Sequence, residues 1–210
     1  MNDRLYWLTL ISGAGFWLVF SGQVLPQVDF WTLFSVWLLS CLLAGLSADR
    51  LFSRLVYGDF RENPGKFILV GMGSAVLLYF VFWLGHLVLS AFLADYSFSL
   101  SSIYSLKSGQ NPWRIGIFLT LIIGPGEELW WRGFLQRHWT SRLGSWPAMG
   151  LVAALYTAVH LSTKNPVLLL AALVSGLWWG YQYLRFKSLL ANVVSHVLWD
   201  LMVFIFFPFS

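Results

Sequence analysis

The chain has 210 residues, of which 58% are hydrophobic and only 10% are charged, and its formal net charge is +4. A mean hydropathy of +0.70 and recurring apolar runs exclude a separate soluble domain and indicate a polytopic helical membrane protein. The small positive charge is spread over short loops, which fits membrane anchoring better than nucleic-acid binding. Cys41 is the single cysteine, so an internal disulfide and a Cys/His zinc site are both excluded.

In chain order, seven apolar stretches suit membrane-spanning helices. They cover residues 5–24, 30–46, 67–92, 113–135, 146–161, 167–183 and 189–209. A loop with Pro26 is expected at 23–29, and turns are expected at Asn63-Pro64-Gly65 and Lys164-Asn165-Pro166. We therefore predict an all-α bundle of about seven spans that forms one integral membrane domain over residues 1–210. Residues 1–111 carry no motif, and residues 112–210 carry all of the polar motifs.

The positive-inside rule gives this bundle an orientation. With the amino terminus in the cytoplasm, nine basic residues fall inside: Arg4, Arg50, Arg54, Arg61, Lys66, Arg137, Arg142, Arg185 and Lys187. Three fall outside: Lys107, Arg114 and Lys164. We therefore expect the amino terminus inside and the carboxyl terminus outside.

The fourth stretch places two carboxylates and a guanidinium in an otherwise apolar chain. An ionised side chain in the bilayer centre costs roughly 2.5–3.5 kcal/mol on insertion scales, so such groups need partners and usually a function. On a helix, Glu128 and Arg132 are four residues apart and share a face, which predicts an ion pair. Glu127 points about 100° away, so it is the carboxylate that remains available for chemistry.

Two later stretches place histidines at a similar depth. Tyr156 and His160 are four residues apart in the fifth stretch, and so are His196 and Asp200 in the seventh. Polar groups that three helices bring to one level are typical of sites built inside helical bundles. His86, in the third stretch, is instead expected to be a buried histidine that donates to a backbone carbonyl.

The order Glu-Glu-x-x-x-Arg-Gly, aromatic-x-x-x-His and His-x-x-x-Asp resembles the CAAX prenyl protease and bacteriocin-processing family of intramembrane glutamic endopeptidases. The three motifs here are Glu127-Glu128-Leu129-Trp130-Trp131-Arg132-Gly133, Tyr156-Thr157-Ala158-Val159-His160 and His196-Val197-Leu198-Trp199-Asp200. The resemblance covers roughly residues 124–201 and makes 112–210 the part with the catalytic-motif helices. It implies an endopeptidase that uses no metal or other cofactor.

The resemblance also implies roles for these residues. Glu127 and His160 would activate a water molecule for attack on the scissile carbonyl, with Glu128 and Arg132 as the supporting pair. His196 would stabilise the oxyanion, and Asp200 would share that contact from a position that is typically Asn in the prenyl protease. Tyr156 supports His160 and stands where Phe is usual.

An ionised Asp200 would repel an oxyanion, because oxyanion holes need hydrogen-bond donors. We therefore prefer that Asp200 keeps His196 as the donating imidazolium. The implied substrate is a hydrophobic or lipidated peptide segment that enters from the bilayer or the cytoplasm. A chain this short suggests a bacterial protein of the cytoplasmic membrane. For such proteins the resemblance covers bacteriocin maturation, self-immunity and removal of carboxyl-terminal sorting segments.

Three other functions are compatible with the sequence. The five acidic and histidine residues also suit a zinc or di-iron hydrolase, which chelator sensitivity would reveal: Glu127, Glu128, His160, His196 and Asp200. A non-catalytic immunity protein that binds a toxin or receptor would keep its activity after Glu127→Ala. A transporter with a proton relay would make the Glu-Glu-x-x-x-Arg-Gly grouping a coincidence.

Overall fold

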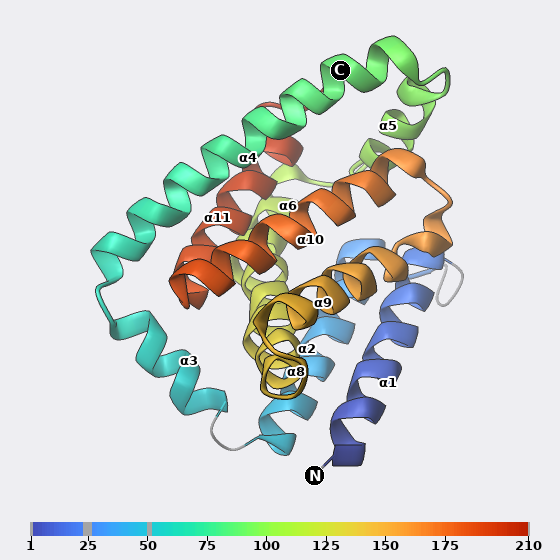
Figure 1. The fold of residues 1–210 in the computed structure, drawn as a ribbon. Helices are drawn as coiled ribbons and strands as arrows, with labels where there is room; N and C mark the ends of the chain where they lie inside the picture. The colour runs from blue at the N-terminus through green and yellow to red at the C-terminus, as the bar shows by residue number, and fades with distance from the viewer. Residues whose placement is uncertain (1, 23–26, 50–51, 210) are drawn as a thin grey trace.

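The computed structural model describes residues 2–22, 27–49 and 52–209, and within these ranges the chain is helical and contains no strand (Figure 1). The all-α prediction is therefore confirmed. Pro26, most of the loop predicted at 23–29, the end of the first stretch and Arg50 lie outside the described residues.

The first half of the chain contains α1 Asn2–Ser21, α2 Phe30–Ala48, α3 Phe52–Arg61, α4 Pro64–Phe92 and α5 Tyr96–Ser105. A continuous helical run follows, with α6 Pro112–Phe118, η1 Leu119–Ile123, α7 Gly124–Glu127, η2 Glu128–Gln136 and α8 Arg137–Leu143. The last part contains α9 Ser145–Val159, η3 Leu161–Thr163, α10 Pro166–Phe186, α11 Leu189–Leu201 and η4 Met202–Phe206. Here η1, η2 and η4 are π-helical, and η3 is a single 3₁₀ turn.

Several of these helices begin where the sequence supplies a capping side chain. Asp29 accepts a hydrogen bond from the Thr32 amide at the start of α2, and Ser188 accepts one from the Ala191 amide at the start of α11. Asn165 caps α10 in the same way, with Pro166 in the first turn. These caps satisfy amide groups that have no partner inside their own helix.

The expected number of spans is larger than the structure supports. Among the described residues, four helices are long and apolar enough to cross a membrane: α2, α4, α10 and α11 with its continuation into η4. Of the other predicted spans, α9 has only 15 residues, and α1 begins with the polar sequence Asn2-Asp3-Arg4. The fourth predicted span is divided into short α and π segments, so no single helix in it has the required length.

The central run from α6 to α8 packs closely against its neighbours because two glycines open space on it. A Cβ atom on Gly124 would lie 2.8 Å from Val197 of α11, and one on Gly126 would lie 2.7 Å from Leu38 of α2. Both distances are below ordinary van der Waals contact. These glycines therefore let the segment with Glu127 and Glu128 lie between α2 and α11.

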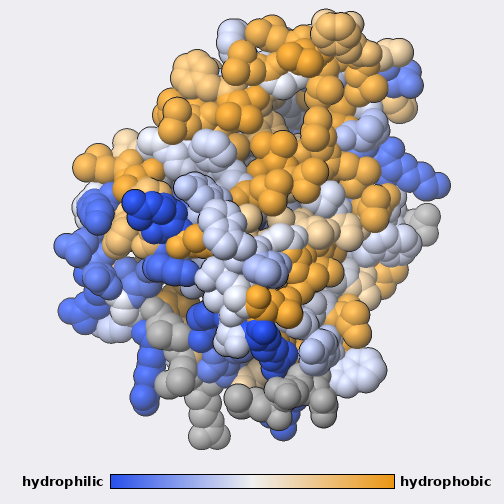
Figure 2. All heavy atoms as spheres, viewed as in Figure 1, coloured by the Kyte–Doolittle hydropathy of each residue, from blue (hydrophilic) through white to orange (hydrophobic). Residues whose placement is uncertain are grey.

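Around this run, α1 packs on α2, α4 on α11, and α9 on α10 (Figure 1). The long helix α4 keeps many apolar side chains exposed, such as Leu69, Leu77 and Phe92, and its outer face suits lipid contact. Figure 2 shows hydrophobic residues over much of this face, with hydrophilic residues gathered over α3 and the adjoining helix ends. The amino and carboxyl termini lie at opposite ends of the bundle in Figure 1.

Candidate active site

The ion pair of Glu128 and Arg132 connects three helices: η2, α10 and α11. Its Oε1 accepts a hydrogen bond from Arg132 at 2.9 Å, and its Oε2 accepts one from Asn192 of α11 at 2.9 Å. Arg132 also donates to the Gly176 carbonyl of α10 at 3.1 Å. The side chains of Glu128, Arg132 and Asn192 are fully buried, so the ion pair predicted from the i, i+4 spacing is present and shielded from water.

His196 is held on both sides of its ring. Its Nδ1 lies 2.8 Å from Glu128 Oε1, and the ring stacks on Trp179 with centroids 3.7 Å apart and planes 19° apart. Because an ionised carboxylate only accepts, Nδ1 is the donor in this contact. The other nitrogen, Nε2, lies 3.5 Å from Glu127 Oε2 and 3.6 Å from Asp200 Oδ2. Nε2 is therefore directed at the space between the two carboxylates.

Glu127 is buried and occupies a different environment from Glu128. Its Oε2 accepts a hydrogen bond from the Tyr156 hydroxyl at 3.3 Å and faces His196 Nε2. The Tyr156 ring also packs edge-on against Trp131 at 5.3 Å, which fixes the direction of the hydroxyl. The two glutamates contact opposite nitrogens of the same imidazole, as their rotation about the helix axis leads one to expect.

His160 lies at the end of α9, where its Nδ1 is 2.7 Å from the Tyr156 carbonyl. A carbonyl only accepts, so Nδ1 carries the hydrogen and Nε2 of the neutral ring keeps its lone pair. The ring packs on Phe20 of α1, with centroids 4.1 Å apart. This tautomer makes Nε2 of His160 a proton acceptor.

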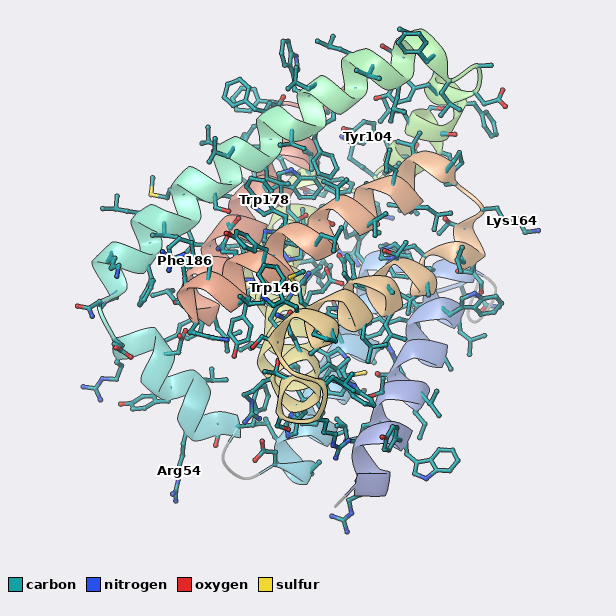
Figure 3. The ribbon with its side chains drawn as sticks, in the orientation of Figure 1. Arg54, Tyr104, Trp146, Lys164, Trp178 and Phe186 are labelled. Carbon is teal, nitrogen blue, oxygen red and sulfur yellow. The ribbon has the colours of Figure 1, made fainter. Side chains whose placement is uncertain are left out.

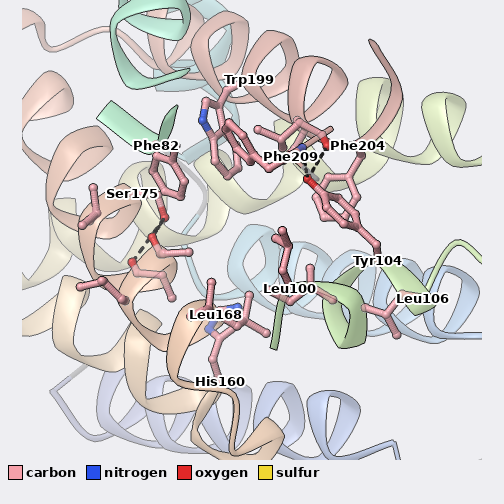
Figure 4. Close-up of a pocket in the computed structure, with 18 of the residues that line it drawn as sticks. Phe82, Leu100, Tyr104, Leu106, His160, Leu168, Ser175, Trp199, Phe204 and Phe209 are labelled. Carbon is pink, nitrogen blue, oxygen red and sulfur yellow. Dashed lines mark hydrogen bonds between the residues drawn. The ribbon is translucent and has the colours of Figure 1, made fainter. Parts of the chain in front are cut away.

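A cavity of about 230 Å³ joins these side chains. Five of the predicted site residues line it: Glu127, Tyr156, His160, His196 and Asp200. Its other walls are mostly aromatic and aliphatic side chains from helices on both halves of the chain. Figure 4 shows His160 on one side, with Leu100 and Tyr104 of α5 and Phe209 across from it. The cavity therefore combines a polar cluster with an apolar surface, which is typical of sites that bind hydrophobic ligands.

Glu128 and Arg132 are not among the residues that line the cavity; Glu128 holds Nδ1 of His196, and Arg132 holds Glu128. The sequence led us to expect that Asp200 keeps His196 as an imidazolium, and in the structure Asp200 approaches Nε2 while Glu128 contacts Nδ1. His86 differs from expectation, because its Nδ1 lies 2.6 Å from the Tyr96 hydroxyl and the residue borders the cavity.

The sequence reasoning missed two residues of this cluster. Asn192 donates to both Glu128 and the Trp179 carbonyl. Its position one turn before His196 could have indicated this, because residues four apart share a helix face. Trp179 gives no such signal, because a tryptophan in an apolar helix looks like any other packing residue. Its indole nitrogen donates to Ser195 at 3.1 Å, which fixes the ring under His196.

Within the part of the chain that the structure describes, no group of three or more His, Cys, Asp or Glu side chains has the geometry to hold a metal ion.

The family model described as Type II CAAX prenyl endopeptidase Rce1-like matches residues 109–202. This range contains all seven predicted site residues, from Glu127 to Asp200. No curated protein and no solved structure matches the chain. The resemblance inferred from the three motifs is confirmed over this range, and helices α1 to α5 lie outside it.

Proposed function

We propose that this chain, whose motif-bearing half matches the type II CAAX prenyl endopeptidase family, is an integral membrane endopeptidase that cleaves a hydrophobic or lipidated peptide segment. The observation that carries the proposal is the shared cavity, which Glu127, His160 and His196 line together with apolar side chains. Apolar walls favour a substrate that is itself apolar, because removing its apolar surface from water contributes about 25 cal/mol of favourable free energy per Å².

The proposed reaction is metal-independent hydrolysis. Glu127 and Nε2 of His160 together bind one water molecule and accept its proton as its oxygen attacks the scissile carbonyl carbon. The new C–O bond converts the carbonyl into an oxyanion. The C–N bond then breaks, and the accepted proton passes to the leaving nitrogen.

His196 supplies the oxyanion contact in this proposal. With Nδ1 donating to Glu128, a second hydrogen on Nε2 gives an imidazolium that donates into the cavity. Asp200, 3.6 Å from Nε2, keeps that positive charge next to the reacting carbonyl. Asn192 and Arg132 act through Glu128, which makes them positioning residues.

We also propose that the amino terminus lies in the cytoplasm and that the membrane is a bacterial cytoplasmic membrane. Support for the orientation comes from the excess of basic residues predicted on that side and from the hydrophilic surface over α3 (Figure 2).

The test compares membranes from cells that express the unmodified protein with membranes from cells that express Glu127→Gln, and it sequences new peptide termini in both. We expect termini that appear only with the unmodified protein and that lie in or beside hydrophobic segments. Identical termini in both samples would contradict the proposal and favour a non-catalytic immunity role. Loss of cleavage after chelation, restored by zinc or iron, would instead favour a metal-dependent hydrolase.

A further inference from the structure

The helix α3 connects α2 to α4 at the edge of the bundle (Figure 1). One face packs inward: Phe52 is 2% exposed and contacts the Phe134 ring edge-on at 5.7 Å, and Val56, one turn later, packs against the same core. Arg54, Tyr57 and Arg61 are exposed on the helix. A short helix with one apolar face and a basic outer face is typical of elements that lie in the membrane–water interface.

Exposed basic side chains on and beside α3 form a surface that we call the basic corner. It consists of Arg54, Arg61, Lys66, Arg185 and Lys187. Figure 3 shows Arg54 directed away from the bundle, and Phe186, beside Arg185, lies on the same side of the molecule as α3. Two acidic residues of this region, Asp59 and Glu62, leave it a net charge of +3, from five basic minus two acidic side chains.

Most of these cations lie over the ring of an adjacent aromatic residue. Arg61 lies 5.2 Å from the Tyr57 ring and Lys66 lies 5.3 Å from the Phe67 ring. Arg185 and Lys187 lie over the rings of Phe186 and Tyr183, at 5.7 and 5.9 Å. Aromatic rings are enriched at the level of lipid headgroups, where long basic side chains reach outward from the apolar layer. Cations paired with such rings are therefore suited to the level of lipid headgroups.

A direct hydrogen bond joins this corner to the helix that carries the site. Asp59 of α3 accepts from the Leu190 amide at 2.9 Å, and Ser188 accepts from the Ala191 amide at 3.2 Å. These two side chains cap the first turn of α11, which begins at Leu189 and includes Asn192. The position of α3 is thus linked to the start of the helix that presents His196.

We propose that the basic corner binds the headgroups of anionic phospholipids and that Asp59 transmits this binding to the first turn of α11. The partner is a lipid bilayer surface with negative charge, which the net charge and the headgroup-level aromatic rings both fit. Each basic side chain near such a surface strengthens binding about fivefold. The binding step does not depend on the endopeptidase proposal, because it concerns a different face of the molecule.

The binding test uses the purified full chain in detergent and adds dioleoylphosphatidylglycerol or dioleoylphosphatidylcholine, with bound lipid counted by native mass spectrometry. We expect tighter binding of phosphatidylglycerol, and we expect Arg54→Gln to weaken it about fivefold. The matched control is Lys164→Gln, which removes one exposed positive charge from the turn before α10 and is expected to leave binding unchanged. Equal binding of both lipids, or equal weakening by both variants, would overturn the headgroup site.

The transmission step is tested by hydrogen exchange of peptides that cover residues 188–193. Phosphatidylglycerol is expected to slow exchange of the Leu190 amide at least threefold in the unmodified protein. Asp59→Ala is expected to abolish that slowing while the lipid still binds, and Asp59→Asn, which keeps an acceptor oxygen, is expected to retain it. Bound phosphatidylglycerol with unchanged exchange in the unmodified protein would refute the link. None of these readouts requires proteolysis, so their failure is distinct from failure of the proposed function.

Discussion

Arg132→Ala is the substitution whose effect follows most directly from the structure. The guanidinium donates to Glu128 at 2.9 Å and to the Gly176 carbonyl at 3.1 Å, and it lies over the rings of Tyr156 and Trp179. It is 0% exposed. Alanine therefore removes a charge, two hydrogen bonds and the packing of the side chain at once.

Breaking a buried ion pair by removal of one partner costs about 3–5 kcal/mol, because the other charge stays buried. Two contacts to Glu128 survive in the variant, from Asn192 and from His196, so we expect about 3 kcal/mol of lost stability. Arg132→Lys keeps the charge but not the planar fork that reaches two acceptors, so an intermediate loss is expected.

The assay is equilibrium unfolding in mixed detergent micelles, with Arg114→Ala as the matched control. Arg114 forms the same type of pair with Asp29 at 2.7 Å, but its side chain is 37% exposed, so the loss should stay below about 1 kcal/mol. If Arg132→Ala destabilises the protein no more than Arg114→Ala, the idea that Glu128 requires a buried counter-charge is refuted.

Three further outcomes are expected. Tyr156→Phe removes the hydroxyl that donates to Glu127 and should slow turnover by up to about tenfold in a kinetic assay; an unaltered rate would contradict this. Asn192→Leu should cost about 1–3 kcal/mol in micellar unfolding, because it leaves a buried carboxylate oxygen without its donor; unaltered unfolding would speak against that contact. The hydrogen bond from Arg114 lowers the pKa of Asp29. The stability that this pair adds to the folded protein is therefore present above about pH 4, and it is lost as the pH falls through the pKa of Asp29 in the folded state. The melting difference between Asp29→Asn and the unmodified protein should therefore shrink on acidification, and a difference that stays constant with pH would count against it.

The motif spacing predicted a large part of the cluster because contacts between residues four apart depend only on the helix that carries both of them. The i, i+4 relation brought Glu128 to Arg132 and placed Asp200 near His196, even though residues 128–136 are π-helical and not α-helical. Residues four apart in a π-helix still lie close to one face, so the argument from spacing holds for Glu128 and Arg132.

Contacts between helices were not predictable in the same way. The sequence does not contain the register of α10 against α11, so it did not reveal that Trp179 stacks on His196. The number of spans was overestimated for a related reason. Apolar composition alone does not fix the length of a helix, so the stretch that forms the 15-residue α9 was counted as a span although about 20 residues are needed to cross a bilayer.

The most direct measurement is the cleavage rate of Glu127→Gln on a substrate found by the comparison of termini, with melting of both proteins measured in parallel. Removing a general base typically lowers the rate by about 10²–10⁴-fold, and we expect a loss of that size with unchanged melting. A correctly folded Glu127→Gln protein that cleaves at a near-native rate would contradict the assignment of Glu127 as the residue that activates water.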